Sequence, residues 1–94
     1  MRLRFYIDPE TGAPHIYKHR LLESEVEEVL ANAGEDRQGR DGVRIAIGRA
    51  LSGRLLRVIY VPDPQPHSYF VITGIEVQGK AALAYRRRQR KKQR

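Results

Sequence analysis

Three short apolar segments between residues 43 and 73 constrain the fold of this chain more than any other feature. They cover residues 43–49, 55–61 and 69–73, and turn residues rich in glycine, serine and proline separate them. β-branched and aromatic residues are frequent in all three, as is typical of strands bounded by turns. The sheet that they predict needs a covering layer, which the remaining residues must supply.

The strongest helix pattern lies just before this block of strands. Leu22, Val26, Val29 and Leu30 recur at the spacing of one helix face, and glutamates occupy most positions between them. Gly34 can end this helix in a left-handed conformation. Residues 35–42 are polar and include two glycines, so we expect a loop there.

Two further elements complete the predicted order. A strand at residues 3–7 ends at a turn signal, and a helix over residues 80–90 follows Gly79. The predicted fold class is α+β, a small antiparallel β-sheet packed with helices in the order β-α-β-β-β-α, with sequential strands antiparallel. We expect strand 69–73 to lie inside the sheet, because it is apolar on both faces.

The chain is a single domain with a strongly asymmetric charge. It has 94 residues, 18 Lys and Arg, 11 Asp and Glu, and a net charge of +7, and a chain of this length builds one modest core. We divide it into a body of residues 1–79 and a basic helix or tail of residues 80–94. The tail has eight basic residues and no acid, whereas the body has ten basic and eleven acidic residues.

The basic segment predicts an anionic partner, and RNA is the partner we favour. The candidate RNA-binding residues are Lys18, Lys80, Arg86, Arg87, Arg88, Arg90, Lys91 and Lys92. Only residues 81–85 of this segment can pack on the body, so we expect the rest to project or fray. A solvated tail or a segment that binds an acidic protein stays open, whereas a lipid surface is disfavoured because residues 86–94 lack bulky apolar side chains.

Several classes of protein are disfavoured by what the sequence lacks. There are no cysteines, which excludes disulfides, cysteine zinc sites and thiol nucleophiles. No apolar run approaches the roughly 18–20 residues of a membrane span, and the N-terminus does not resemble a signal peptide. We therefore expect a soluble cytoplasmic protein that uses no membrane contact, no metal and no small-molecule cofactor.

A set of side chains has the chemistry for metal-free RNA cleavage. That reaction needs a base for the ribose 2′-hydroxyl, a cation for the phosphorane and an acid for the leaving 5′-oxygen. The candidate catalytic residues are His19, Arg44, Arg57 and Tyr60, and Glu35 and Tyr85 could fill the same roles. The acidic-basic loop of residues 35–37 and the strand arginines Arg44, Arg49 and Arg57 could form a phosphate pocket on one outward face of the sheet. The alternatives are a surface histidine and exposed cross-strand ion pairs.

Several stretches, in matching order over nearly the whole chain, resemble the BrnT-like toxins and a related family of small bacterial proteins. These stretches are Tyr17-Lys18-His19, residues 25–30, Ile45-Ala46-Ile47-Gly48, residues 53–60, residues 71–74, Gly79-Lys80 and residues 84–88. The resemblance implies a RelE-like fold and a ribonuclease neutralised by a DNA-binding antitoxin protein.

The resemblance carries over to individual residues only in part. Lys18 and His19 match the family's Lys-His pair, Arg57 and Tyr60 lie in the matching strand, and Ile75 stands where BrnT toxins have an arginine. Two functions therefore stay open. One is a toxin-type, metal-independent endoribonuclease that uses His19 as acid or base. The other is a non-catalytic nucleic-acid-binding or protein-interaction module of the same fold.

Overall fold

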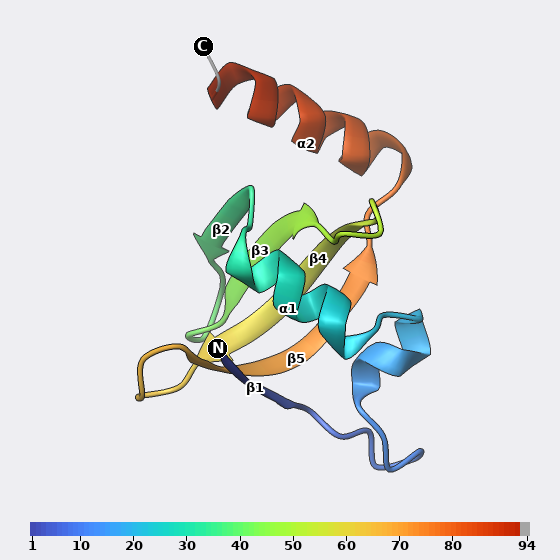
Figure 1. Ribbon diagram of the computed structural model, residues 1–94, viewed down its shortest axis with the longest axis vertical. Coiled ribbons are helices and arrows are strands. Elements are labelled where there is room, and N and C mark those ends of the chain that lie inside the picture. The colour runs from blue at the N-terminus through green and yellow to red at the C-terminus, as the bar shows by residue number, and fades with distance from the viewer. Residues whose placement is uncertain (93–94) are drawn as a thin grey trace.

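The computed structural model describes residues 1–92 as a five-stranded mixed sheet with two α-helices and one short 3-10 helix (Figure 1). Gln93 and Arg94, the end of the predicted basic segment, lie outside the described residues. In chain order the elements are β1 (Arg2–Phe5), η1 (His15–His19), α1 (Glu23–Ala31), β2 (Glu35–Gln38), β3 (Arg44–Arg49), β4 (Leu55–Pro62), β5 (Ser68–Glu76) and α2 (Gly79–Lys92).

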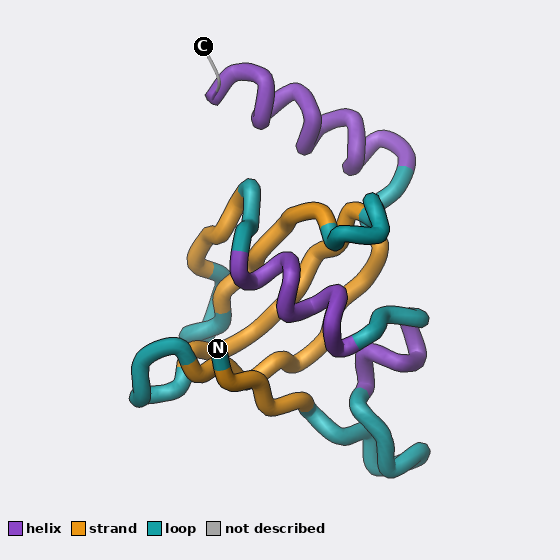
Figure 2. The backbone as a smooth tube through the Cα atoms, viewed as in Figure 1, coloured by secondary structure: helices purple, strands orange, loops and turns teal. Residues whose placement is uncertain are grey.

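The sheet has the strand order β1-β5-β4-β3-β2, which confirms that β5 is an interior strand. Strands β2 to β5 pair antiparallel, but β1 pairs parallel with β5, with Arg2 beside Ser68. The expectation of a purely antiparallel sheet was therefore wrong. The chain after β1 crosses one face of the sheet through η1 and α1 and enters β2 at the opposite edge, which leaves β1 beside the last strand (Figure 2).

Residues 35–38 form a strand where we expected a loop. Glu35 pairs with Ile47 and Gln38 with Arg44, so β2 extends the sheet at its edge. Backbone hydrogen bonds make this pairing, and the side chains of Asp36, Arg37 and Gln38 stay exposed. Charged side chains are common on edge strands because they oppose pairing with another chain. Polarity was for this reason a poor indicator of a loop here.

Helix α1 and η1 cover one face of the sheet. Ala46, Val58 and Leu56 lie in one buried cluster with Val26 and Val29 of α1. Glycines allow the close approach, since a Cβ on Gly48 would lie 3.2 Å from the Cα of Ala33, and one on Gly74 would lie 2.7 Å from Leu21 Cδ2.

The strand arginines do not share one outward face, as we expected. Arg44 lies on the α1 face because it shares its side of β3 with Ala46, whereas Arg49 lies five residues away and points to the opposite face. Arg57 pairs with Ile47 across the sheet and therefore lies on the same face as Arg49. The predicted arginine pocket thus loses Arg44 and keeps the other two on one face.

Helix α2 covers one end of this second face. Ala82 and Tyr85 pack against Ile47 and Leu55 in a separate small cluster. The molecule measures 42 × 28 × 25 Å, and α2 lies at one end of its long axis, with the β1–η1 segment at the other (Figure 1). Within residues 1–92, no helix has the length and apolar character required to cross a membrane.

Candidate nucleic-acid interface

Helix α2 carries most of the predicted RNA-binding residues and is held on the body by one aromatic side chain. Tyr85 is 7% exposed, and its hydroxyl lies directly over Gly34, where a Cβ would come within 1.9 Å of Tyr85 Oη. Ala82, one turn earlier, is equally buried. Only a glycine at position 34 allows Tyr85 to approach this closely, so the Gly34–Tyr85 contact fixes where α2 docks.

The second half of α2 is also bound to the body, which corrects the expectation of a projecting or frayed tail. The guanidinium of Arg88 donates two hydrogen bonds to the carboxylate of Glu35. Gln89 Nε2 and Lys92 Nζ both donate to the carbonyl oxygen of Gly34, at 3.0 and 3.3 Å. The hydrogen bond from Arg88 lowers the pKa of Glu35, which therefore stays ionised at neutral pH. The described part of α2 is thus a fixed element.

The distribution of ion pairs leaves a surplus of positive charge on α2. Four of the ten body cations pair with carboxylates, Arg4 with Asp63, Lys18 with Asp8, Arg44 with Asp36, and Arg54 with Glu25 and Glu76. The eleven acidic residues of the body balance the charge of all ten, whereas α2 has no acidic residue. Five exposed cations on the described part of α2 form neither an ion pair nor a side-chain hydrogen bond within residues 1–92: Lys80, Arg86, Arg87, Arg90 and Lys91. These five side chains can therefore neutralise an external anion without first breaking an internal ion pair.

Hollows border α2 on both of its flanks, and two of them hold residues of the predicted site. The first, of about 470 Å³, lies between α2 and the sheet and is lined by Arg37, Arg57, Ile75, Ala84, Arg88 and neighbouring residues. We call it the Arg57 groove. Arg57 Nε is buried there without a hydrogen-bond partner among the described residues. An unsatisfied buried N–H of a guanidinium costs free energy, and such groups are rare in native structures.

Arg44 and Tyr60, two of the predicted catalytic residues, meet at a different place. Both donate to the carboxylate of Asp36, Tyr60 Oη at 2.5 Å and Arg44 Nε at 2.9 Å. Burial and the hydrogen bond to Asp36 raise the pKa of Tyr60 to about 12. Tyr60 therefore keeps its proton at neutral pH and cannot act as a base there, and the charge of Arg44 is already neutralised.

His19 and Lys18 lie in η1, away from α2. Lys18 Nζ binds the Asp8 carboxylate at 2.8 Å, and the ring of His19 contacts that of His15 with centroids 5.4 Å apart. Ile16 of η1 is buried in the core on the α1 side of the sheet, whereas Arg57 lies on the α2 side. The four predicted catalytic residues are thus distributed over three places.

Sequence reasoning missed Gln89, which binds Gly34 from a segment expected to project. Arg37 belonged to the predicted phosphate pocket and does line the Arg57 groove, but it lies on strand β2 and not in a loop. A weak signal for Gln89 was its position as the one uncharged residue in the segment 86–92, among six cations. Among the described residues, no group of three or more His, Asp or Glu side chains has the arrangement of a metal site. Comparisons with known proteins give no significant match to a protein-family model, a curated protein or a solved structure.

Proposed function

We propose that this protein binds RNA and that α2 is the surface that holds the phosphate backbone. The observation that carries the proposal is the set of five unpaired cations on a helix that is itself fixed to the body. Cations that neutralise phosphates release condensed counterions, and this release supplies most sequence-independent affinity for nucleic acids. A fixed helix also loses less conformational entropy on binding than a frayed tail would lose.

The side chains of α2 favour a nucleic acid over a lipid surface. A membrane-binding helix needs an apolar face opposite its charges, and the buried Tyr85 and Ala82 are already used against the body. On the solvent side only Leu83 is a large exposed apolar residue of α2. Among nucleic acids, the resemblance to BrnT-like toxins favours RNA.

The salt dependence of binding tests the proposal. If five cations contact phosphates, the slope of log K against log salt for a single-stranded RNA should be about −3.5. Arg87→Gln/Lys91→Gln should make this slope shallower by about 1.4, because two phosphate contacts are lost.

The matched control removes the same charge from the body. Arg2→Gln/Arg40→Gln changes two exposed cations that are not part of α2 and should leave the slope within about 0.3 of the wild-type value. Equal slopes for the two double variants, or a wild-type slope near zero, would contradict the proposal.

A metal-independent endoribonuclease of the BrnT-like, RelE-like toxin type, paired with an antitoxin protein, is the second candidate function. The observation that favours it is the buried, unpartnered Nε of Arg57 in the groove beside α2. In such cleavage a base takes the 2′-hydroxyl proton, the 2′-oxygen attacks phosphorus, and an acid protonates the departing 5′-oxygen. Arg57 is suited to stabilise the phosphorane, and His19 is suited to move a proton.

Because Arg57 and His19 lie on different sides of the sheet, they are tested as two separate centres. Wild-type protein, Arg57→Gln and His19→Ala are incubated with total RNA in EDTA. Loss of cleavage in only one variant assigns the cleavage centre to that residue's side of the sheet. RNA that stays intact with the wild-type protein contradicts the endoribonuclease function and leaves the RNA-binding function standing.

A further inference from the structure

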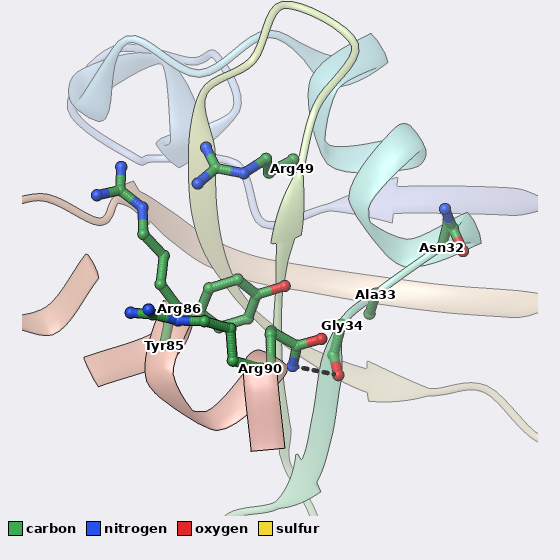
Figure 3. A pocket seen from close by; sticks show the side chains of 8 residues that line it. Asn32, Ala33, Gly34, Arg49, Tyr85, Arg86 and Arg90 are labelled. Carbon is green, nitrogen blue, oxygen red and sulfur yellow. Dashed lines mark hydrogen bonds between the residues drawn. The ribbon is translucent and has the colours of Figure 1, made fainter. Parts of the chain in front are cut away.

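The second hollow beside α2 gathers three arginines from two different elements. It measures about 750 Å³ and is lined by Asn32, Ala33, Gly34, Arg49, Tyr85, Arg86, Gln89 and Arg90. We call it the Arg49 cleft. Arg86 and Arg90 lie one turn apart on α2, and Arg49 ends β3. The guanidinium groups of all three extend to the same side of the cleft (Figure 3).

The charge of these three arginines is not cancelled within residues 1–92. Arg49 Nη1 donates to the carbonyl oxygen of Gly53 at 3.0 Å, and neither it nor Arg86 nor Arg90 pairs with a carboxylate in that part of the chain. Glu35 follows the cleft residue Gly34 directly, but its carboxylate is bound by Arg88 on the other flank of α2. The Gly34 carbonyl is likewise occupied by Gln89 (dashed line in Figure 3). The groups that would repel an anion are thus already engaged.

We propose that the Arg49 cleft is a site for a phosphate monoester, such as the 5′-phosphate end of an RNA or a free nucleoside monophosphate. An internal phosphodiester carries one negative charge, whereas a phosphate monoester carries roughly −1.5 to −2 at pH 7 and three acceptor oxygens. Three guanidinium groups on one side of a cleft suit the second kind of anion, because a guanidinium can donate two parallel hydrogen bonds to a phosphoryl group. The RNA form of this inference rests on the proposed function, and the free-nucleotide form does not.

The test compares two oligoribonucleotides that differ only at the 5′ end. Wild-type protein should bind the 5′-phosphorylated form at least about tenfold more tightly than the 5′-hydroxyl form, the effect of one or two charge-assisted hydrogen bonds. Arg49→Gln and Arg86→Gln should each abolish most of this preference. Arg87→Gln, which removes the same charge from the outer face of α2, should weaken both RNAs and keep the preference. Thermal unfolding midpoints check that all three variants fold.

Adenosine 5′-monophosphate and adenosine form a second arm, measured by calorimetry without RNA. If the monophosphate binds, adenosine does not, and Arg49→Gln removes the binding, the cleft is supported as a nucleotide site. If neither RNA binds in that case, the proposed function fails and this inference stands. Equal affinity for the two RNAs with no binding of the monophosphate overturns the inference and leaves RNA binding intact. Binding of none of the four ligands overturns both.

Discussion

Gly34 is the residue on which the position of α2 depends. Its backbone N–H donates to Ile47, its carbonyl accepts from Gln89 and Lys92, and the Tyr85 hydroxyl lies against its Cα. We expect Gly34→Ala to destabilise the protein by about 1–3 kcal/mol, as overpacking of a filled site does. Urea unfolding of the variant measures this loss.

A second substitution shows whether the loss arises at Tyr85. The new Cβ would lie 1.9 Å from Tyr85 Oη but 2.9 Å from Cζ, so removing the hydroxyl relieves the worst contact. Gly34→Ala should therefore cost less free energy in a Tyr85→Phe background than in the wild type. Additive effects of the two changes would show that the clash is relieved elsewhere.

Asp8 makes the stability of the protein depend on pH in the acid range. Its buried carboxylate binds Lys18 Nζ and the backbone N–H of Glu10, and the hydrogen bond from Lys18 is the largest cause that lowers the Asp8 pKa to about 2. Because the folded pKa lies below the unfolded value of about 3.9, the stabilisation is present above pH 4 and is lost as pH falls toward 2.

The expected result is a pH-dependent difference between two asparagine variants. Asp8→Asn should unfold at lower urea concentration than the wild type at pH 7, and the gap should close between about pH 4 and pH 2. Asp41→Asn is the control, because Asp41 is exposed and has a left-handed backbone that asparagine also adopts. A gap for Asp8→Asn that persists at pH 2 would contradict the ion-pair explanation.

At the scale of elements, α2 depends on the body for its helical state. It has 14 residues, and Arg86/Arg90, Arg87/Lys91 and Arg88/Lys92 are like-charge pairs four residues apart, which destabilise an isolated helix. Tyr85→Ala removes the main docking contact, so we expect α2 to lose its helicity while the sheet stays folded. Far-ultraviolet circular dichroism measures the lost helix, and amide exchange of β3 to β5 reports on the sheet. Leu83→Ala, on the exposed side, should change neither.

Local patterns predicted the elements that are rich in apolar side chains. Strands β3, β4 and the interior strand β5, and helix α1, follow from apolar spacing, because burial of their side chains decides both their conformation and their orientation. Strand β2 did not follow, because its pairing with β3 rests on backbone hydrogen bonds to which side-chain polarity gives no signal. The parallel pairing of β1 depends on where α1 crosses the sheet, which is a property of the assembled chain.

The candidate site, like the fold, could be predicted only in part from the sequence. The cations of α2 were evident from composition, but their convergence with Arg49 and Arg57 depends on the docking of α2, and a contact between residues as distant as Gly34 and Tyr85 decides that. The predicted set of His19, Arg44, Arg57 and Tyr60 was chosen by chemical type. Side chains alternate between the two faces along a strand, and this alternation, with the pairing of β3 and β4, places Arg44 and Arg57 on opposite faces of the sheet.

The whole molecule has its positive charge at one end of a 42 Å axis and a nearly neutral body (Figure 1). Such a distribution attracts a polyanion toward α2 before any specific contact forms, which raises the association rate at low ionic strength. The outer cations Arg87 and Lys91 contribute to this field, whereas Arg49 and Arg86 line a cleft that a bound phosphate would desolvate. The two groups should therefore affect different rate constants.

Stopped-flow binding of a 5′-phosphorylated oligoribonucleotide separates these contributions. Arg87→Gln/Lys91→Gln should lower the association rate constant a few-fold at about 50 mM salt, with little change in dissociation, as expected of charges at the rim of an interface. The effect should vanish toward 1 M salt, where the Debye length falls to about 3 Å. Arg86→Gln should instead raise the dissociation rate constant, because a bound phosphate loses a direct partner. If both variants changed only the association rate, the Arg49 cleft would contribute nothing beyond its long-range field.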